Sequence, residues 1–325
     1  MGMNTKAASD LKTIPKNSRK TLRISLFWKQ IKKQQVLLWM SVPIMLHLAL
    51  FQFVPLWGWL MAFKDYHIGQ NLLEADWVGL KHFQTLLKHD DFLQDLRNNI
   101  VMNTMQLVTG TFCAITLAIV LSELKGKWFV RTVQTMTYLP HFVSMVVVAN
   151  IFVMLLSPDG GLVNQLMIKW GWIDEGIFYF GQAKWFWYLH TLILTWKGFG
   201  WGAIIYLASI SGIDPSLYDA AQVDGASRWQ RVKYIVIPSI MPTLVLLTIL
   251  DIGYLVTGGF ESQFLLGNVI NADYSEVISI LALRLGLNEG NFSFGTAVGI
   301  FNSVVGMTLV LIVNAIARRY KANLF

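Results

Sequence analysis

Charged residues are scarce in this sequence. Asp, Glu, Lys and Arg make up 14% of its 325 residues, whereas soluble domains average about 25%. Apolar residues make up 54%, and six charge-poor runs each exceed the ~20 residues that a helix needs to cross a bilayer. A water-soluble fold needs polar faces to cover such helices, so the composition excludes a soluble globular protein.

Cysteine and nucleotide-binding motifs are also lacking. The single cysteine, Cys113, cannot form an internal disulfide. The only Gly-Lys pair, Gly126-Lys127, has Leu121 in place of the leading glycine of a phosphate loop and Trp128 in place of its hydroxyl residue. We therefore expect no cofactor in this chain, and any hydrolysis of Mg²⁺-ATP must take place on separate subunits.

The apolar runs predict an all-α membrane protein with about six transmembrane helices. Residues 1–35 form a basic N-terminal arm and residues 36–325 a single transmembrane domain. Lys197 is the one charge in the fourth run and Asp251 the one charge in the fifth. The expected spans are 36–63, 98–122, 132–158, 185–213, 234–260 and 291–317.

The distribution of Lys and Arg predicts the orientation. If the N-terminus is cytoplasmic, the inner segments hold 18 of these residues and the outer segments hold 7. The positive-inside rule then places both termini in the cytoplasm. The formal net charge of +7 is explained by nine basic residues in the N-terminal arm, without any nucleic-acid-binding motif.

Residues 213–238, on the predicted cytoplasmic side, read as two short helices. Asp214 is a good N-cap, and Pro215 suits the first helical position. Gly225 suits the left-handed conformation that ends a helix, and Ser227 can cap the next helix. Pro238 marks the entry to the fifth span. Such an amphipathic pair predicts a docking element for a groove on a partner.

This segment resembles the signature loop of permease subunits in binding-protein-dependent ABC importers. The family pattern is Glu-Ala-Ala, three residues, Gly, nine residues, Ile-x-Leu-Pro. The matching residues are Asp219, Ala220, Ala221, Gly225, Ile235, Ile237 and Pro238. Asp219 departs from the family glutamate and shortens the reach of the carboxylate, while Ile237 replaces leucine at equal volume.

Further segments resemble the sugar-importer branch, and within it the oligosaccharide and polysaccharide permeases related to the maltose importer, a group that includes alginate import components. They are Lys64–Tyr66, Tyr138–Phe142, Ser157–Gly161, Asn164–Gln165, Trp196–Lys197 and Gly200–Gly202.

The resemblance implies a type I importer permease fold in the bacterial inner membrane and import of an oligosaccharide, acidic ones such as alginate fragments included. It also implies two ATPase subunits, an extracytoplasmic binding protein and a second permease, with a heterodimer favoured over a homodimer. The residues it assigns to ATPase coupling are Asp219, Ala220, Ala221, Asp224, Gly225, Trp229 and Pro238.

Two charges at membrane depth are candidates for the substrate cavity. Because a charge near mid-bilayer is costly, Lys197 and Asp251 should face protein, water or a partner, either paired with each other or bridged through substrate. Sugar sites often use aromatic faces, which adds Trp196, Trp201, Tyr254 and Phe260 as candidates. The alternative for each residue is packing or lipid contact.

Two other functional classes stay open at this point. A membrane enzyme would need clustered titratable groups, but His47, His141 and His190 stand isolated in the sequence. A secondary transporter would need ion-coupling carboxylates in several spans, and Asp251 alone qualifies.

Overall fold

The computed structural model describes residues 33–318, so most of the predicted basic arm (1–35) lies outside the described residues. The chain divides into two compact units, Met1–Leu60 and Met61–Phe325. The described part of the first unit consists of the helix α3 (Gln35–Leu48), the π-helical turn η1 (Ala49–Phe53) and most of the 3-10 helix η2 (Val54–Phe63). Together they form the apolar segment Gln35–Phe63, 29 residues long and able to cross a membrane.

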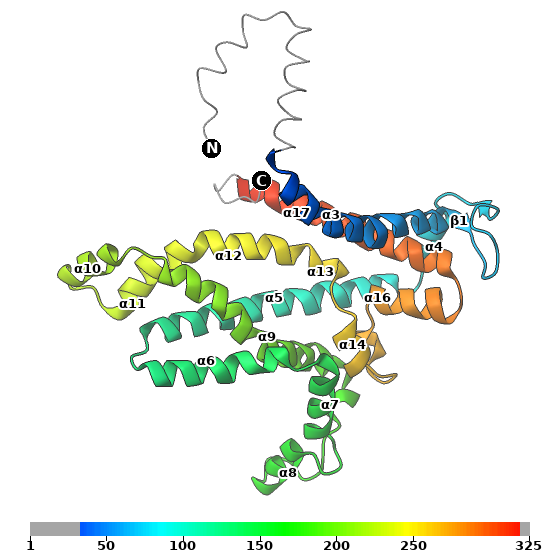
Figure 1. The fold of residues 1–325 in the computed structure, drawn as a ribbon. Helices are drawn as coiled ribbons and strands as arrows, with labels where there is room; N and C mark the ends of the chain where they lie inside the picture. The colour runs from blue at the N-terminus through cyan, green and yellow to red at the C-terminus, as the bar shows by residue number, and fades with distance from the viewer. Residues whose placement is uncertain (1–32, 319–325) are drawn as a thin grey trace, which may run out of the picture. The chain divides into compact units, whose positions relative to one another are not determined.

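The second unit is a helical bundle with one short β-ribbon (Figure 1). The ribbon pairs β1 (Lys64–Asp65) antiparallel with β2 (Asp76–Trp77). The longer helices are α5 (Phe92–Glu123), α6 (Lys127–Phe142), α9 (Phe186–Ser211), α12 (Ile237–Ile252) and α17 (Phe292–Arg318). The shorter helical elements are α4 (Lys81–Lys88), α7 (Met145–Leu155), α8 (Leu162–Lys169), η3 (Tyr179–Gly181), η4 (Ala183–Trp185), α10 (Pro215–Val223), α11 (Arg228–Arg231), η5 (Val232–Val236), α13 (Tyr254–Thr257), α14 (Glu261–Leu266), α15 (Ala272–Ser275), α16 (Ile278–Leu281) and η6 (Ala282–Asn288).

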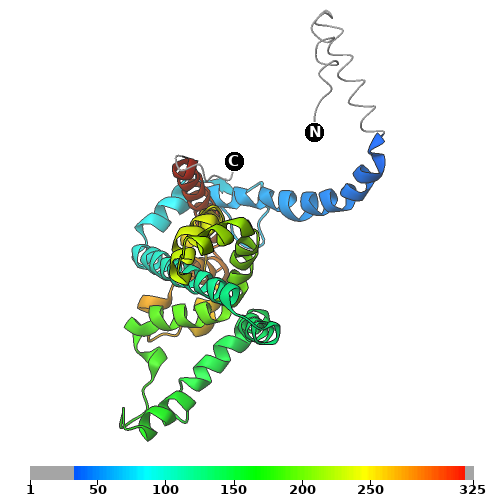
Figure 2. The same cartoon turned by 90° about the vertical axis from the view of Figure 1, so that its left-hand side faces the viewer.

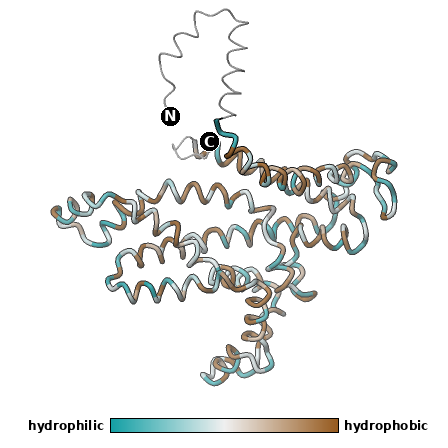
Figure 3. The backbone as a smooth tube through the Cα atoms, in the orientation of Figure 1, coloured by the Kyte–Doolittle hydropathy of each residue, from teal (hydrophilic) through white to brown (hydrophobic). Residues whose placement is uncertain are grey.

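Small residues allow the long helices of the second unit to approach closely. Ala114 and Ala118 of α5 pack with Ala203 of α9 in a buried cluster that also holds Val236 and Ile240. Small side chains bring helix backbones together, which favours association in a bilayer. Figure 2 shows these helices from the end that carries α10 and α11, and Figure 3 shows hydrophobic residues concentrated along the helices and hydrophilic ones at the turns.

Among the described residues, five helices are long and apolar enough to cross a membrane, and a sixth span is present if a bent pair counts as one. The predicted second span begins earlier than expected, because α5 already starts at Phe92. The all-α prediction with about six spans is confirmed.

The predicted third span, 132–158, is a bent pair of helices in the structure. It consists of α6 and α7, which meet at an angle of 101°. Pro140 lies in the last turn of α6, and Val143 is extended. Ser144 then starts a new helix, because its side chain accepts a hydrogen bond from the Val147 amide at 3.4 Å.

No helix end falls at Pro238, the predicted entry to the fifth span. The helix runs without interruption over Arg228–Ile252, so Pro238 lies inside a continuous helix. Proline normally breaks a helix because it lacks an N–H and crowds the carbonyl four residues earlier. Here the π-helical turn Val232–Val236 precedes it, and the wider turn accommodates the missing hydrogen bond.

Candidate functional site

The segment 213–238 is shaped by its own caps. The Asp214 carboxylate accepts a hydrogen bond from the Ser216 amide at 2.9 Å, and Pro215 occupies the first turn of α10. This amide holds the pKa of the Asp214 carboxyl below its usual value of 3.8. The N-cap predicted at Asp214 is confirmed.

Gly225 ends α10 in the left-handed conformation, with a φ of +73°. The Ala226 amide donates to the Ala221 carbonyl at 2.9 Å, and the Gly225 amide donates to the Gln222 carbonyl at 3.1 Å. These two bonds form a Schellman motif, which satisfies the last carbonyls of the helix.

A capping box begins the second helix of the segment. The Ser227 hydroxyl accepts from the Gln230 amide at 3.3 Å, and the Ser227 amide donates to Gln230 Oε1 at 2.7 Å. The predicted cap at Ser227 is confirmed, and the Schellman motif and the capping box define the turn between α10 and α11 through local contacts.

One side of the segment is anchored to the bundle and the other is open. Ile213 and Tyr218 pack against the cluster formed by α5, α9 and α12, and Arg231 lies 3.9 Å from Glu123 at the end of α5. Val223 and Trp229, by contrast, are 89% and 71% exposed.

The seven residues predicted to couple the ATPase fall on or next to the open side. Asp219, Ala220, Asp224, Gly225, Trp229 and Pro238 are exposed and Ala221 is half-buried. Ala221, Asp224 and Gly225 also line a hollow of about 270 Å³ together with Gln230 and Tyr234.

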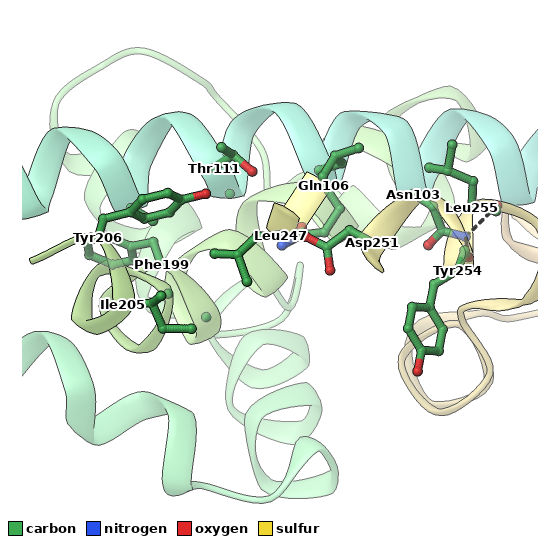
Figure 4. A pocket seen from close by; sticks show the side chains of 15 residues that line it. Asn103, Gln106, Thr111, Phe199, Ile205, Tyr206, Leu247, Asp251, Tyr254 and Leu255 are labelled. Atoms are coloured by element: carbon green, nitrogen blue, oxygen red, sulfur yellow. Dashed lines mark hydrogen bonds between the residues drawn. The ribbon is translucent and has the colours of Figure 1, made fainter. Parts of the chain in front are cut away.

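A second hollow, of about 440 Å³, opens between α5, α9 and α12 (Figure 4). Its lining residues recur at helical spacing along each of the three helices. The polar members are Asn103, Gln106, Thr111, Tyr206, Asp251 and Tyr254. Of the predicted cavity residues, Asp251 and Tyr254 therefore do line a cavity.

Lys197 is placed differently from the prediction. Its ammonium group donates to the His141 carbonyl at 2.8 Å, at the end of α6 where the helix leaves its last carbonyls without intrahelical partners. A cation there also interacts favourably with the negative end of the helix dipole. Within residues 33–318 no ion pair joins Lys197 to Asp251, so the predicted pairing is not formed.

The predicted aromatic candidates on α9 also pack elsewhere. The ring of Trp201 stacks on His141 with centroids 4.5 Å apart, and Trp196 meets Phe152 edge-on at 5.4 Å. A Cβ on Gly200 would overlap the Thr137 carbonyl, so α9 and α6 touch through their backbones. One face of α9 therefore packs against the bent helix pair α6 and α7, whereas Gly198, Phe199 and Gly202 on another face line the cavity. Phe260 stacks on Phe264 and is absent from the described cavity lining.

Sequence reasoning missed the polar residues of α5. Asn103 lines the cavity and also donates to the carbonyls of Leu255 and Gly258, at 2.9 and 3.1 Å. One turn earlier, the Asn99 amide group donates to Gly258 and its oxygen accepts from the Ile278 amide. Asn103, Gln106 and Thr111 share one helix face inside an uncharged run, and such a polar stripe at helical spacing is the signal that would have identified them.

The buried histidine offers no enzyme site. His190 is 1% exposed, and its Nε2 lies 3.0 Å from the Ser262 hydroxyl. This pair is enclosed by packing and is not part of the cavity lining. No cluster of three or more potential metal ligands occurs in the described part of the chain.

Apolar helices enclose a cavity that a few polar side chains line, and a capped helix pair lies at one end. This arrangement defines the class of molecule as a helical membrane transport subunit. Comparison with known proteins identifies the family. Residues 107–322 match the family described as "Binding-protein-dependent transport system inner membrane component". The chain belongs to this family, which confirms the predicted permease role and the inner-membrane location.

Relatives are similar over nearly the whole chain. The polygalacturonan/rhamnogalacturonan transport system permease protein YteP of Bacillus subtilis (strain 168) is 38% identical over 313 residues, covering 96% of this chain and 95% of the relative. Protein LplB of the same organism is 33% identical over 290 residues, covering 89% and 91%.

A solved structure has the same fold. A chain of a bacterial ABC transporter involved in the import of the acidic polysaccharide alginate is 36% identical, with a TM-score of 0.83, covering 90% of this chain and 98% of that chain. The alginate transporter in complex with an alginate pentasaccharide-bound periplasmic protein matches equally well, with a TM-score of 0.83 and coverage of 91% and 98%. The predicted ABC importer permease fold is confirmed.

Proposed function

We propose that this chain translocates an oligosaccharide that a binding protein delivers, driven by ATPase subunits that dock on segment 213–238. The observation that carries this proposal is the link between segment and cavity. Ile213 and Tyr218 of the segment pack on the same cluster of α5, α9 and α12 whose helices enclose the cavity.

The subunit works with a periplasmic binding protein and ATPase partners, as its family and relatives do. We propose two ATPase subunits, which bind ATP and Mg²⁺, and a second permease that differs from this chain. The exposed Val223 and Trp229 supply apolar anchors for a groove on the ATPase. Asp219 and Asp224 flank them and suit a groove with basic residues.

The proposed coupling is mechanical. Closure of the ATPase pair moves α10, and its rigid caps transmit the movement without bending the segment. The Arg231–Glu123 contact and the Tyr218 packing then pass the movement to the ends of α5 and α12. Because these helices line the cavity, their displacement exposes it to one side of the membrane or the other.

Oligosaccharides are the proposed substrate class because of the cavity chemistry and the relatives. Amides, hydroxyls and aromatic rings converge on the hollow, which suits hydroxyl-rich rings. The relatives are named for polygalacturonan, rhamnogalacturonan and alginate. Oligosaccharides derived from acidic polysaccharides, alginate fragments included, are therefore among the candidates.

Copurification and labelling test this proposal. The chain should purify with an ATPase, and transport should require ATP. Transport by the isolated chain, driven by an ion gradient, would instead support a secondary transporter. In intact cells a label in the loop 64–97 should react with an impermeant reagent, and one at Gln230 should not. Reversed accessibility would contradict the proposed orientation.

A further inference from the structure

Asp251 is a carboxylate without a protein counter-charge. It projects from α12 into the cavity and is the one charged residue among the described residues that line it (Figure 4). Within residues 33–318 its side chain has no ion pair and no hydrogen bond. A charge kept unpaired inside a span is costly and marks a functional position.

Lys197 is the basic residue that lies next to the cavity residues in the sequence, and its side chain is already bound elsewhere. Lys197 precedes the cavity residue Gly198 on α9, but its ammonium group is bound to the His141 carbonyl on the other face of the helix. Asp251 therefore sets the sign of the charge in this chain's part of the cavity, and that sign is negative.

The other polar groups of the cavity lining are neutral. Asn103 and Gln106 contribute amides from α5, and Tyr206 and Tyr254 contribute phenol groups from α9 and α13. An ionised carboxylate only accepts hydrogen bonds, so it matches the hydroxyl groups of a sugar ring. The same carboxylate repels a carboxylate on the ring, because the two groups carry like charges.

We propose that Asp251 is a specificity-determining residue, which accepts hydrogen bonds from the hydroxyls of an uncharged sugar ring and disfavours a uronate ring at the same place. This inference rests on the proposed import of oligosaccharides and sharpens it. An oligosaccharide from an acidic polysaccharide would then place either an uncharged sugar ring, or a uronate ring whose charge is neutralised, next to Asp251.

The test uses two probes that differ in charge and in one methyl group at each carboxyl. They are a galacturonate trisaccharide and its methyl ester, each carried by the same binding protein at saturating concentration. Uptake is measured in proteoliposomes that contain the complete importer. Because the binding protein is common to all variants, its own preference cancels when the ester-to-acid ratio of each variant is divided by that of the wild type.

The wild-type importer should favour the ester, and Asp251→Asn should lower the ester-to-acid ratio about tenfold, the effect of removing one like-charge repulsion. Asp251→Ser should lower it in the same direction, so the test does not depend on one variant folding. The matched control is Asp174→Asn, which removes the same charge from an exposed loop and should leave the ratio unchanged.

An unchanged ratio in both Asp251 variants, with normal uptake, would overturn this inference and leave the importer assignment intact. Failure of the wild-type complex to take up either probe or any other oligosaccharide, while it still imports a different solute, would overturn the proposed substrate class and this inference with it.

Discussion

Segment 213–238 connects α9 to α12, two of the helices that enclose the cavity, but the segment and the cavity hold their shape in different ways. The segment is fixed by contacts between neighbours in the sequence, such as Asp214 with Ser216 and Ser227 with Gln230. The cavity is fixed by contacts between helices far apart in the sequence, such as Asn103 with the Leu255 carbonyl. A substitution on the open side of the segment should therefore act on docking, whereas one beside the cavity acts on packing as well.

The largest effect on transport is expected at Gly225. Its φ of +73° strains any residue with a β-carbon, and no atom lies within 4 Å of the position a β-carbon would take. The cost of Gly225→Val, about 1–2 kcal/mol, is therefore conformational and confined to the segment. ATPase copurification and transport should be lost while the spans stay inserted. Gly225→Asn is the matched control, because asparagine tolerates this conformation, and it should retain most activity. Normal transport by the valine variant would contradict the role of the turn.

A substitution at Gly200 tests the close packing of α9 against α6. A methyl group there would overlap the Thr137 carbonyl, so Gly200→Ala should separate α9 from α6 and destabilise the subunit by about 1–3 kcal/mol. Gly198, two residues away on the same helix, has open space around it, and Gly198→Ala should leave the thermal unfolding midpoint in detergent unchanged. Equal midpoints for the two variants would mean that the helices do not meet at Gly200.

Lys197 and Asp251 should behave as independent sites. Lys197→Met removes a charged hydrogen bond to the end of α6 and should lower stability by about 1.5–3 kcal/mol. Lys197→Arg, which keeps a donor, should recover part of the loss. Adding Asp251→Leu should not restore stability, because the two residues are not paired. Recovery in the double variant, measured as a coupling energy in a double-mutant cycle, would show that they do interact.

The smallest effect concerns pH and Asp214. The pKa of this carboxyl is lowered in the folded segment, so its cap is fully present above the unfolded value and is lost as pH falls through the folded value. The carboxyl carbon should titrate with a midpoint below 3.8, followed by NMR and assigned by its absence in Asp214→Asn. The Ser216 amide should exchange faster once Asp214 is protonated. A midpoint at or above the usual value would mean that the cap is not formed in solution.

The difference between local contacts and contacts of distant helices also explains what could be predicted from the sequence. The caps at Asp214, Gly225 and Ser227 depend on local geometry, and each was predictable from residue type and spacing. Composition alone indicated the spans. The contact from Lys197 to His141 depends on how distant helices meet, and no local pattern encodes that. The bend after Phe142 has local signals in Pro140 and Ser144, but these do not give its angle. The π-helical turn before Pro238 is likewise a tertiary accommodation that the proline by itself does not reveal.

Site-directed cross-linking tests the central claim most directly, namely that segment 213–238 carries the ATPase. The native Cys113 is first replaced by alanine, which leaves a chain without cysteine. Val223→Cys, at a position 89% exposed, should then cross-link to the ATPase within the assembled importer, with a yield that changes when ATP is bound. A matched cysteine at the exposed Asp174 of a distant loop should give no such product. ATPase cross-linked at position 174 and not at position 223 would contradict the account.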